Sequence, residues 1–144
     1  MPAWIDAGFD EYAKRMPREY GLELIEVKPE PRDRGKSVEQ MLVAETARIR
    51  AACGDDRIVA LDERGKAWTT RDVASKLTQW RAENARVAFV IGSADGLDET
   101  FKRSAADRVA VSAMTLPHGL VRVILAEQLY RAASVIAGHP YHRD

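Results

Sequence analysis

The stretch RIVAL, residues 57–61, decides the fold class of this 144-residue chain. It is short, apolar and partly β-branched, as are strands of parallel sheets that are covered on both faces. RVAFVIG, residues 86–92, has the same character and is the strongest strand candidate, and VAV at 109–111 is another. LELIEV, residues 22–27, is β-prone and is followed by two prolines, so it predicts a further strand.

Helical patterns alternate with these strands. Apolar side chains recur at helical spacing over residues 2–16, over 37–53, from Thr69 or Thr70 onward, and from Pro117 to Gly138. Ser37 opens a capping-box pattern with Gln40 at the start of the second helix. The predicted buried stripe of that helix comprises Val38, Met41, Leu42, Ile49 and Ala52. Strands alternating with helices predict a single α/β domain over residues 1–144, with a mostly parallel sheet and flanking helices.

Composition narrows the possible functions. The 22 basic and 22 acidic residues give a formal net charge of zero, so a nucleic-acid role must rest on local basic patches such as PRDRGK, residues 31–36. No apolar run reaches membrane-spanning length and no leader pattern is present, so we expect a cytoplasmic protein without membrane contact. Cys53 is the single cysteine, and we expect it to pack as a small hydrophobe at a helix end.

Ligands of parallel α/β sheets bind beyond the carboxyl ends of the strands. Three segments have that position: LDERGKAW after the strand ending at Leu61, GSADGL at 92–97, and SAMTLPHG at 112–119. Their glycines allow close approach of a backbone, and loop amides can hydrogen-bond a flat heterocycle. The chain contains neither G-x-G-x-x-G nor G-x-x-x-x-G-K-[ST], which argues against a dinucleotide fold and against a flavodoxin-like carrier.

The C-terminal stretch GHPYHRD, residues 138–144, concentrates groups that can donate, accept or transfer a proton. His139 and His142 are three residues apart, but Pro140 disfavours a regular helix across them and no third ligand accompanies them. We therefore predict no metal site. Neither Cys53 nor any serine lies in a pattern typical of an activated nucleophile.

Four stretches closely resemble the ribosomal RNA large subunit methyltransferase H family of the SPOUT superfamily: IVALDERGKAW, VIGSADGL, SAMTLPHGLVRVILAEQLYRAASVIAGHPYHRD and the opening MPAWIDAGFDEYAKRMP. The resemblance covers essentially the whole chain. It implies an α/β fold with a C-terminal trefoil knot, a homodimer, S-adenosylmethionine as cofactor, and methylation of N3 of a pseudouridine in 23S rRNA within the ribosome. The cofactor contacts that it implies fall on Leu61, Gly92, Val111, Ser112, Ala113, Met114, Thr115 and Leu116.

Two departures from the family affect these expectations. Many relatives read I-G-G where this chain has Ile91-Gly92-Ser93, so we expect Ser93 to crowd the cofactor loop or to restrict its backbone. Family members also begin with a β-strand before the M-P-x-W helix, whereas this chain starts at that methionine. We therefore expect the sheet to lack the family's first strand.

The resemblance also gives the tail a role. The N3–H of pseudouridine must lose its proton before nitrogen can attack a methyl group. Tyr141, His142 and Arg143 are the predicted catalytic residues: an imidazole can accept that proton, a guanidinium can bind phosphate or a base carbonyl, and a phenol can stack on a base or hydrogen-bond it. We expect residues 139–144 to be ordered and to complete the active site of the other subunit. The alternative is a knotted dimeric module that binds cofactor or RNA without turnover.

Overall fold

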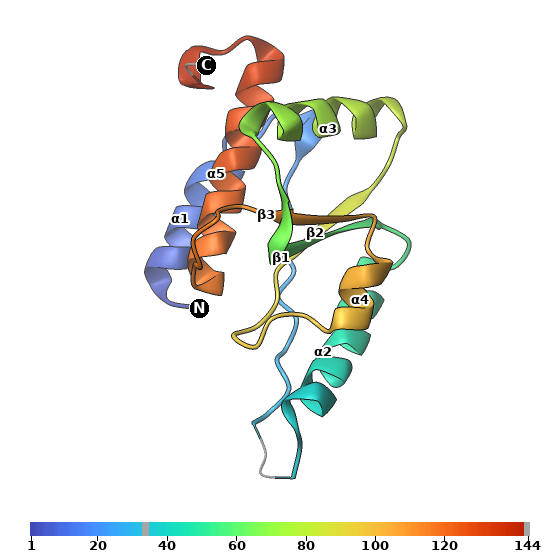
Figure 1. The fold of residues 1–144 in the computed structure, drawn as a ribbon. Coiled ribbons are helices and arrows are strands. Elements are labelled where there is room, and N and C mark those ends of the chain that lie inside the picture. Colours follow the sequence, from blue (N-terminus) through green and yellow to red (C-terminus); the bar gives the residue numbers. More distant parts are fainter. Residues whose placement is uncertain (33–34, 143–144) are drawn as a thin grey trace.

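The computed structural model describes residues 1–32 and 35–142. Within them, β1 (Arg57–Ala67), β2 (Val87–Val90) and β3 (Asp107–Ala110) form a parallel sheet in the order β2-β1-β3. The α-helices are α1 (Ala3–Ala13), α2 (Val38–Cys53), α3 (Thr70–Ala82), α4 (Glu99–Ser104) and α5 (His118–Ala137). Short 3-10 helices span Arg18–Tyr20 and Pro140–His142. The predicted α/β architecture with a parallel sheet and flanking helices is confirmed (Figure 1).

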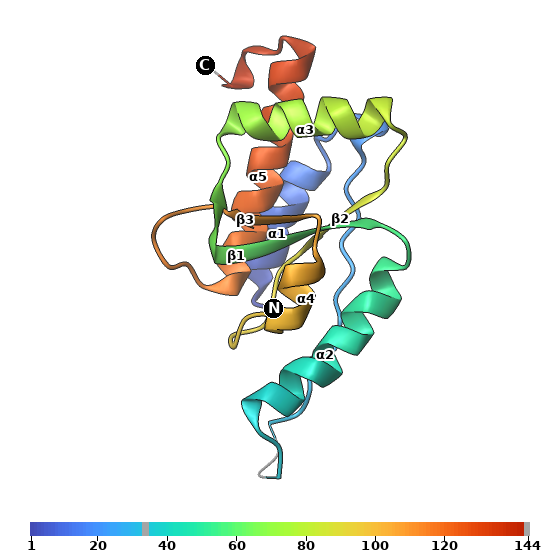
Figure 2. The same cartoon turned by 45° about the vertical axis from the view of Figure 1, so that its right-hand side comes forward.

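The central strand β1 supplies both apolar layers of the core. Successive side chains of a strand point to opposite faces, so Val59 and Ala60, both fully buried, serve different clusters. Val59 packs with side chains of α3 and α5: Ala74, Leu77, Trp80, Leu129 and Ala132. Ala60 packs on the other face with Val90, Leu97 and Phe101. The sheet is thus sandwiched between α3 and α5 on one side and α2 and α4 on the other (Figures 1 and 2).

Helix α5 packs against both α1 and α3. A Cβ atom at Gly119 of α5 would lie 2.3 Å from Cδ1 of Ile5, and one at Gly8 of α1 would lie 3.2 Å from the Val123 methyl groups. The absence of these two side chains lets α1 approach the first half of α5 closely. Leu129 and Ala132 in the second half of α5 pack against α3. Figure 2 shows α3 crossing α5 near its C-terminal end.

Helix α2 begins as predicted. The Gln40 N–H donates to Oγ of Ser37 at 3.1 Å, and the Ser37 N–H donates to Oε1 of Gln40 at 3.0 Å, which completes the capping box. The predicted last residue, Cys53, is confirmed, and burial raises the pKa of its half-buried thiol. Thr69 caps α3 in the same way, with hydrogen bonds to and from Asp72.

The predicted buried stripe of α2 is wrong in part. Val38 and Ala52 are exposed, whereas the polar Glu45 and Thr46 are 6% and 8% exposed. Both buried polar side chains are hydrogen-bonded, as burial requires: Oγ1 of Thr46 donates to the Leu42 carbonyl at 2.7 Å, and Glu45 accepts from outside the helix. On this face of α2, hydrogen-bonded polar side chains are therefore buried, whereas two of the apolar side chains that the periodicity predicted to be buried are exposed.

The predicted strand at residues 22–27 is also wrong. The segment has no strand assignment and no backbone hydrogen bond to another strand among the described residues, and Ile25 is 56% exposed. A groove of about 1140 Å³, lined by this segment and by β2, separates the two. β-propensity is realised only when a partner strand lies alongside, and here β2 is an edge strand of the described sheet.

No helix among the described residues is long and apolar enough to cross a membrane.

The chain of β1 passes unusually close to β3. Leu61 and Lys66 both pair with Val109, so residues 62–65 leave the ladder and return to it. A Cβ atom at Gly65 would lie 2.6 Å from the Val109 nitrogen and 2.7 Å from the Arg108 carbonyl carbon, which no real side chain tolerates. Only glycine allows this approach. The trefoil knot, a property of the whole chain path, remains a prediction.

We predict that Gly65→Ala lowers the free energy of unfolding by about 2 kcal/mol or more, because a rigid backbone must move to admit the methyl group. Gly21→Ala is the control, since its Cβ would meet only the Arg18 carbonyl oxygen, at 3.6 Å, and should change stability by less than about 0.5 kcal/mol. Urea and thermal unfolding measure both. A Gly65→Ala protein as stable as the parent would contradict the close passage.

Candidate active site

The first predicted loop, LDERGKAW, lies mostly inside β1. The expected strand end at Leu61 is wrong, because β1 resumes at Lys66 and Ala67 and runs beside β3. The physical reason is Gly65, which lets the chain rejoin the ladder at Val109. Residues 62–65 are therefore a bulge, held at both ends by strand pairing, and not a free loop.

Leu61 and Val111 line one pocket of about 270 Å³, together with the aromatic side chains of Trp68 and Phe89. Small-molecule sites start at roughly 300 Å³. A ligand of that class would fill this pocket and extend over the loop that continues from Val111. The structure thus brings together two of the residues that the sequence assigned to a cofactor.

The loop at residues 112–116 offers hydrogen-bonding groups of its backbone. Among the described residues, the amides of Ser112, Ala113, Thr115 and Leu116 have no hydrogen-bond partner. The Met114 amide donates to Oγ of Ser112 at 2.9 Å, and Oγ1 of Thr115 donates to Oε2 of Glu63 at 3.1 Å. The second bond ties this loop to the β1 bulge. Unpaired amides beside an apolar pocket fit a ligand that carries a flat, polar heterocycle.

Gly92 occupies a different place from Leu61 and Val111. It lines the large groove beside β2 and does not line the smaller pocket. A Cβ atom at Gly92 would lie 2.5 Å from the carbonyl carbon and oxygen of Gly96, whose φ is +83°, so residues 91–97 fold back on themselves. Ser93 and Gly96 form an antiparallel bridge at the tip of this turn.

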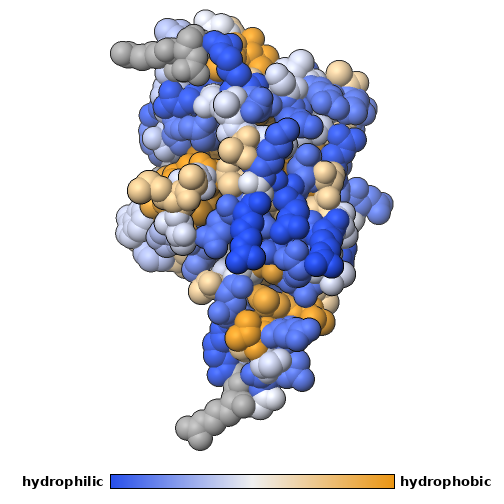
Figure 3. Space-filling view, viewed as in Figure 1, coloured by the Kyte–Doolittle hydropathy of each residue, from blue (hydrophilic) through white to orange (hydrophobic). Residues whose placement is uncertain are grey.

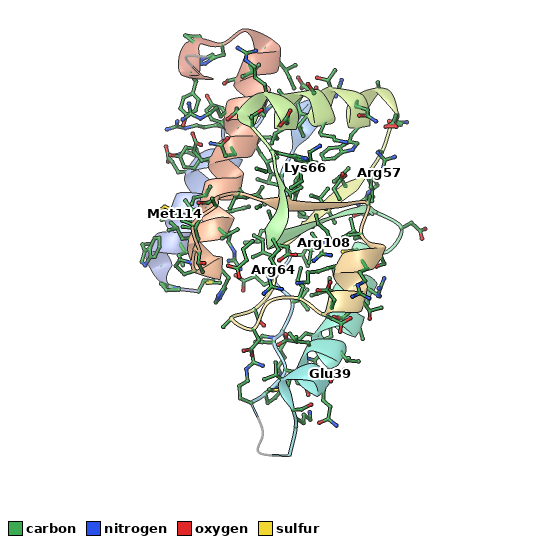
Figure 4. All side chains as sticks on the ribbon, viewed as in Figure 1. Glu39, Arg57, Arg64, Lys66, Arg108 and Met114 are labelled. Atoms are coloured by element: carbon green, nitrogen blue, oxygen red, sulfur yellow. The ribbon has the colours of Figure 1, made fainter. Side chains whose placement is uncertain are left out.

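Asp62 anchors the β1 bulge. Its largely buried carboxylate accepts from the Arg108 guanidinium at 2.7 Å, from the Arg64 amide at 3.4 Å, and lies 3.6 Å from Nζ of Lys102. Burial alone would raise the pKa of Asp62, but the Arg108 hydrogen bond, the Arg64 amide and the Lys102 charge together hold it below its ordinary value. Figure 4 shows Arg64 and Arg108 near each other at this bulge.

The C-terminal tail turns back onto α5. The Gly138 and His139 amides donate to the Val135 and Ser134 carbonyls at 3.2 and 2.9 Å, and Gly138 has φ +70°. This is a Schellman motif, and it confirms the predicted helix end at Gly138. A 3-10 helix, Pro140–His142, follows. The side chain of His142, and Arg143 entirely, lie outside the described residues.

Tyr141 fixes this tail to the helix. Its hydroxyl donates to Oε2 of Glu127 at 2.7 Å, its ring meets Tyr130 edge-on at 4.6 Å, and the Arg131 guanidinium lies 4.9 Å from the ring centre. Burial, followed by the hydrogen bond and the charge of Glu127, raises the pKa of Tyr141. The phenol is therefore protonated at physiological pH, and it can donate a hydrogen bond but not act as a base.

Within one chain, the tail and the candidate cofactor loops are apart. Glu127 lies nine residues beyond the first residue of α5, about 14 Å along the helix axis, whereas the loop at 112–116 leads into that first residue. In the described part of the chain, no hydrogen bond or ion pair joins residues 138–142 to the β1 bulge, to residues 91–97 or to residues 112–116.

The predicted basic patch at 31–36 is partly neutralised. Arg32 pairs with Asp95 at 2.8 Å, Lys36 pairs with the buried Glu30, and Arg34 lies outside the described residues. Sequence reasoning missed two other cations, Arg64 and Lys66, which are exposed and have no acidic side-chain partner in the described ranges. Both belong to the segment LDERGKAW that the sequence analysis had singled out, and their two positive charges in it were the available signal.

Exposed apolar side chains gather where α1 meets the start of α5. Met114 is 77% exposed and Trp4 is 60% exposed, and Met1 lies close to Gly119. Figure 4 places Met114 at the left edge of the molecule, and Figure 3 shows apolar side chains at that edge. We call Met1, Trp4 and Met114 the apolar patch. Large contiguous apolar patches on proteins mark surfaces that contact a partner, which makes this patch a candidate contact surface.

The parallel sheet, the bulged central strand and the amide-rich loop define an α/β protein with a candidate ligand site beside the sheet. Over residues 1–142 the chain matches the family described as "Predicted SPOUT methyltransferase". The chain belongs to the SPOUT methyltransferase family, as the motifs predicted.

Individual relatives agree with this assignment. A protein of Nitrosospira multiformis named ribosomal RNA large subunit methyltransferase H is 59% identical over 144 residues, which cover 99% of this chain and 92% of the relative. Proteins of the same name from Burkholderia multivorans and Cupriavidus metallidurans are 57% and 56% identical, with the same shares of each chain covered.

We predict that Asp62→Asn lowers the free energy of unfolding at pH 7 by about 1–3 kcal/mol, because Arg108 and Lys102 lose a buried charged partner. The folded-state pKa of Asp62 is lowered, so the carboxylate stabilises the fold above the ordinary pKa of about 4 and ceases to do so as pH falls through the lower, folded value. Urea unfolding across that range should show the difference between the two proteins vanishing in acid. A difference that stays constant with pH would contradict this account.

Proposed function

We propose that this protein transfers a methyl group from S-adenosylmethionine to N3 of a pseudouridine in 23S rRNA of the large ribosomal subunit. Membership of a methyltransferase family supports the reaction type. The printed names of the relatives, at 56–59% identity over nearly the whole chain, support large-subunit rRNA as the substrate. Such a reaction belongs in the cytoplasm, where ribosomes are.

The cofactor site that we propose comprises the pocket of Leu61 and Val111 with the loop through Leu116. The apolar pocket wall suits the adenine ring, and the unpaired amides of Ser112, Ala113, Thr115 and Leu116 suit its polar edges. Bound there, S-adenosylmethionine supplies a methyl group already activated by the sulfonium charge. Gly92 lines the separate groove beside β2, so in this proposal the turn at residues 91–97 reaches the cofactor from the end of the neighbouring strand.

The tail residues prepare the nucleophile in this proposal. His142 accepts the N3 proton, since an imidazole titrates near neutral pH. Arg143 contributes a permanent charge that stabilises the resulting anion or binds a phosphate. Tyr141, whose pKa is raised, stays neutral; it holds the tail on α5 through Glu127 and offers a ring face for a base.

The separation of the tail from the loops is the observation that carries a two-subunit site. In one chain, Tyr141 is bound about 14 Å along α5 from the loop that begins the helix. If two copies align their α5 helices in opposite directions, each tail lies beside the other copy's loop. The apolar patch at the start of α5 gives such a homodimer a surface to bury.

Recognition of the RNA rests on local charge in this proposal. The chain has no net charge, so unspecific attraction to phosphate is weak. Arg64 and Lys66 project from the β1 bulge and the strand beside it, next to the candidate cofactor pocket. Cations placed there contact phosphates of an RNA whose target base enters the site.

We predict that deleting residues 139–144 leaves folding and cofactor affinity nearly unchanged and reduces methyl transfer to ribosomes by at least about a thousandfold, because proton removal and base orientation are both lost. Calorimetry measures cofactor binding, and incorporation of labelled methyl groups into hypomethylated ribosomes measures transfer. A parent protein that binds the cofactor but transfers nothing would favour the binding-module alternative.

Mixing subunits tests the shared site. The tail deletion is combined with a loop variant such as Ala113→Trp, chosen because Ala113 is exposed in the candidate cofactor loop, after calorimetry has shown that this variant binds no cofactor. Heterodimers should regain part of the activity, since one composite site is whole again. Absence of rescue, with subunit exchange demonstrated by mass spectrometry, would mean that each tail serves its own subunit.

A further inference from the structure

Glu45 of α2 is a buried carboxyl group that receives hydrogen bonds from two distant segments. The Glu30 amide donates to its Oε2 at 3.0 Å, and the Ser93 hydroxyl donates to its Oε1 at 3.1 Å. These partners are 15 and 48 residues away in sequence. No Lys or Arg of the described residues forms an ion pair with Glu45. Burying a carboxyl group in this position costs free energy of folding unless both hydrogen bonds are made.

The turn at residues 91–97 has few other attachments. Its internal geometry is fixed by the Gly96 amide, which donates to the Ser93 carbonyl at 2.9 Å, and by the contact between Gly92 and Gly96. Leu97 anchors its far end in the core. At the tip, the ion pair of Arg32 with Asp95 is exposed, and exposed pairs contribute little. The bond from Ser93 to Glu45 is therefore the strong external attachment of the tip.

We infer that Glu45 is a positioning residue that holds the turn at residues 91–97, and with it Gly92, in the conformation that receives the cofactor. The inference rests on the proposed function, because it assigns that turn to S-adenosylmethionine. A loop that is already fixed loses less conformational entropy when a ligand binds, so its affinity is higher. Of the two effects expected of Ser93, crowding the cofactor loop or restricting its backbone, the inference builds on the second, because its hydroxyl attaches the loop to α2.

Glu45 and Ser93 touch neither the transferred methyl group nor the attacking nitrogen in this account. Removing the Ser93 hydroxyl should therefore weaken cofactor binding while leaving the rate at saturating cofactor unchanged. A residue that merely stabilised the fold would lower the melting temperature and would change KM and kcat in no fixed ratio.

The test compares Ser93→Ala, Ser93→Thr and Thr46→Val with the parent protein. Ser93→Ala should raise both the Kd and the KM for S-adenosylmethionine about five- to tenfold, the loss expected for one part-buried hydrogen bond, with kcat changed less than about twofold. Ser93→Thr keeps the hydroxyl and should restore most of the affinity. Thr46→Val removes a buried hydroxyl of α2 whose bond stays within the helix, so it should lower the melting temperature without changing KM.

A double-mutant cycle shows whether Ser93 acts through Glu45. Glu45→Gln and Ser93→Ala should be non-additive, the double variant having nearly the same Kd as the weaker-binding single variant. Full additivity, an unchanged Kd for Ser93→Ala, or tighter binding by Ser93→Gly would overturn the inference while the proposed function stands. A well-folded parent protein that binds no S-adenosylmethionine would instead overturn the proposed function, and the inference with it.

Discussion

The close passage of Gly65 against the backbone of Arg108 and Val109 is the constraint on which the candidate site depends. It lets β1 pair with Val109 twice, so residues 62–65 are pushed out of the sheet. Asp62 in this bulge is then tied to Arg108, and Glu63 to Thr115 of the following loop. A side chain at position 65 would separate the two strands and open all these contacts. The arrangement of the β1 bulge and of the candidate cofactor loop tied to it therefore depends on this glycine.

Helix α5 connects the loop at 112–116 to α1, α3 and the C-terminal tail. Its first turn follows the loop at 112–116, its small residues admit α1 and α3, and its last turn ends in a Schellman motif that redirects the tail. Because Tyr141 binds back to Glu127, the tail is carried by a rigid element and not by a free terminus. The same rigidity keeps it away from the loops of its own chain, and the proposed two-subunit site rests on that separation.

Sequence reasoning succeeded where the signals were local. The capping box at Ser37, the helix start after Thr69, the existence of a core strand from Arg57 and the helix end at Gly138 depend on neighbouring residues and are confirmed. The strand at 22–27 failed because pairing depends on a remote neighbour that does not lie alongside. Helix α4 is only six residues long, too short for a periodic pattern. The burial of Glu45 was invisible because its partners are distant in sequence.

The candidate site, like the fold, was predicted only in part from the sequence. The family motifs assign Leu61 and Val111 to the cofactor, and the two residues share a pocket, although β1 does not end at Leu61 as the strand-end argument assumed. Gly92 lines a different groove, because its turn is bonded to α2 through Ser93 and Glu45. The central claim is that this architecture methylates a pseudouridine of large-subunit rRNA. Ribosomes that lack the modification, incubated with the protein and S-adenosylmethionine carrying a trideuterated methyl group, allow mass spectrometry of the digested 23S rRNA to test it. The account predicts one trideuterated methyl group per ribosome, on N3 of a pseudouridine; label on another nucleoside, or none on the RNA, would contradict it.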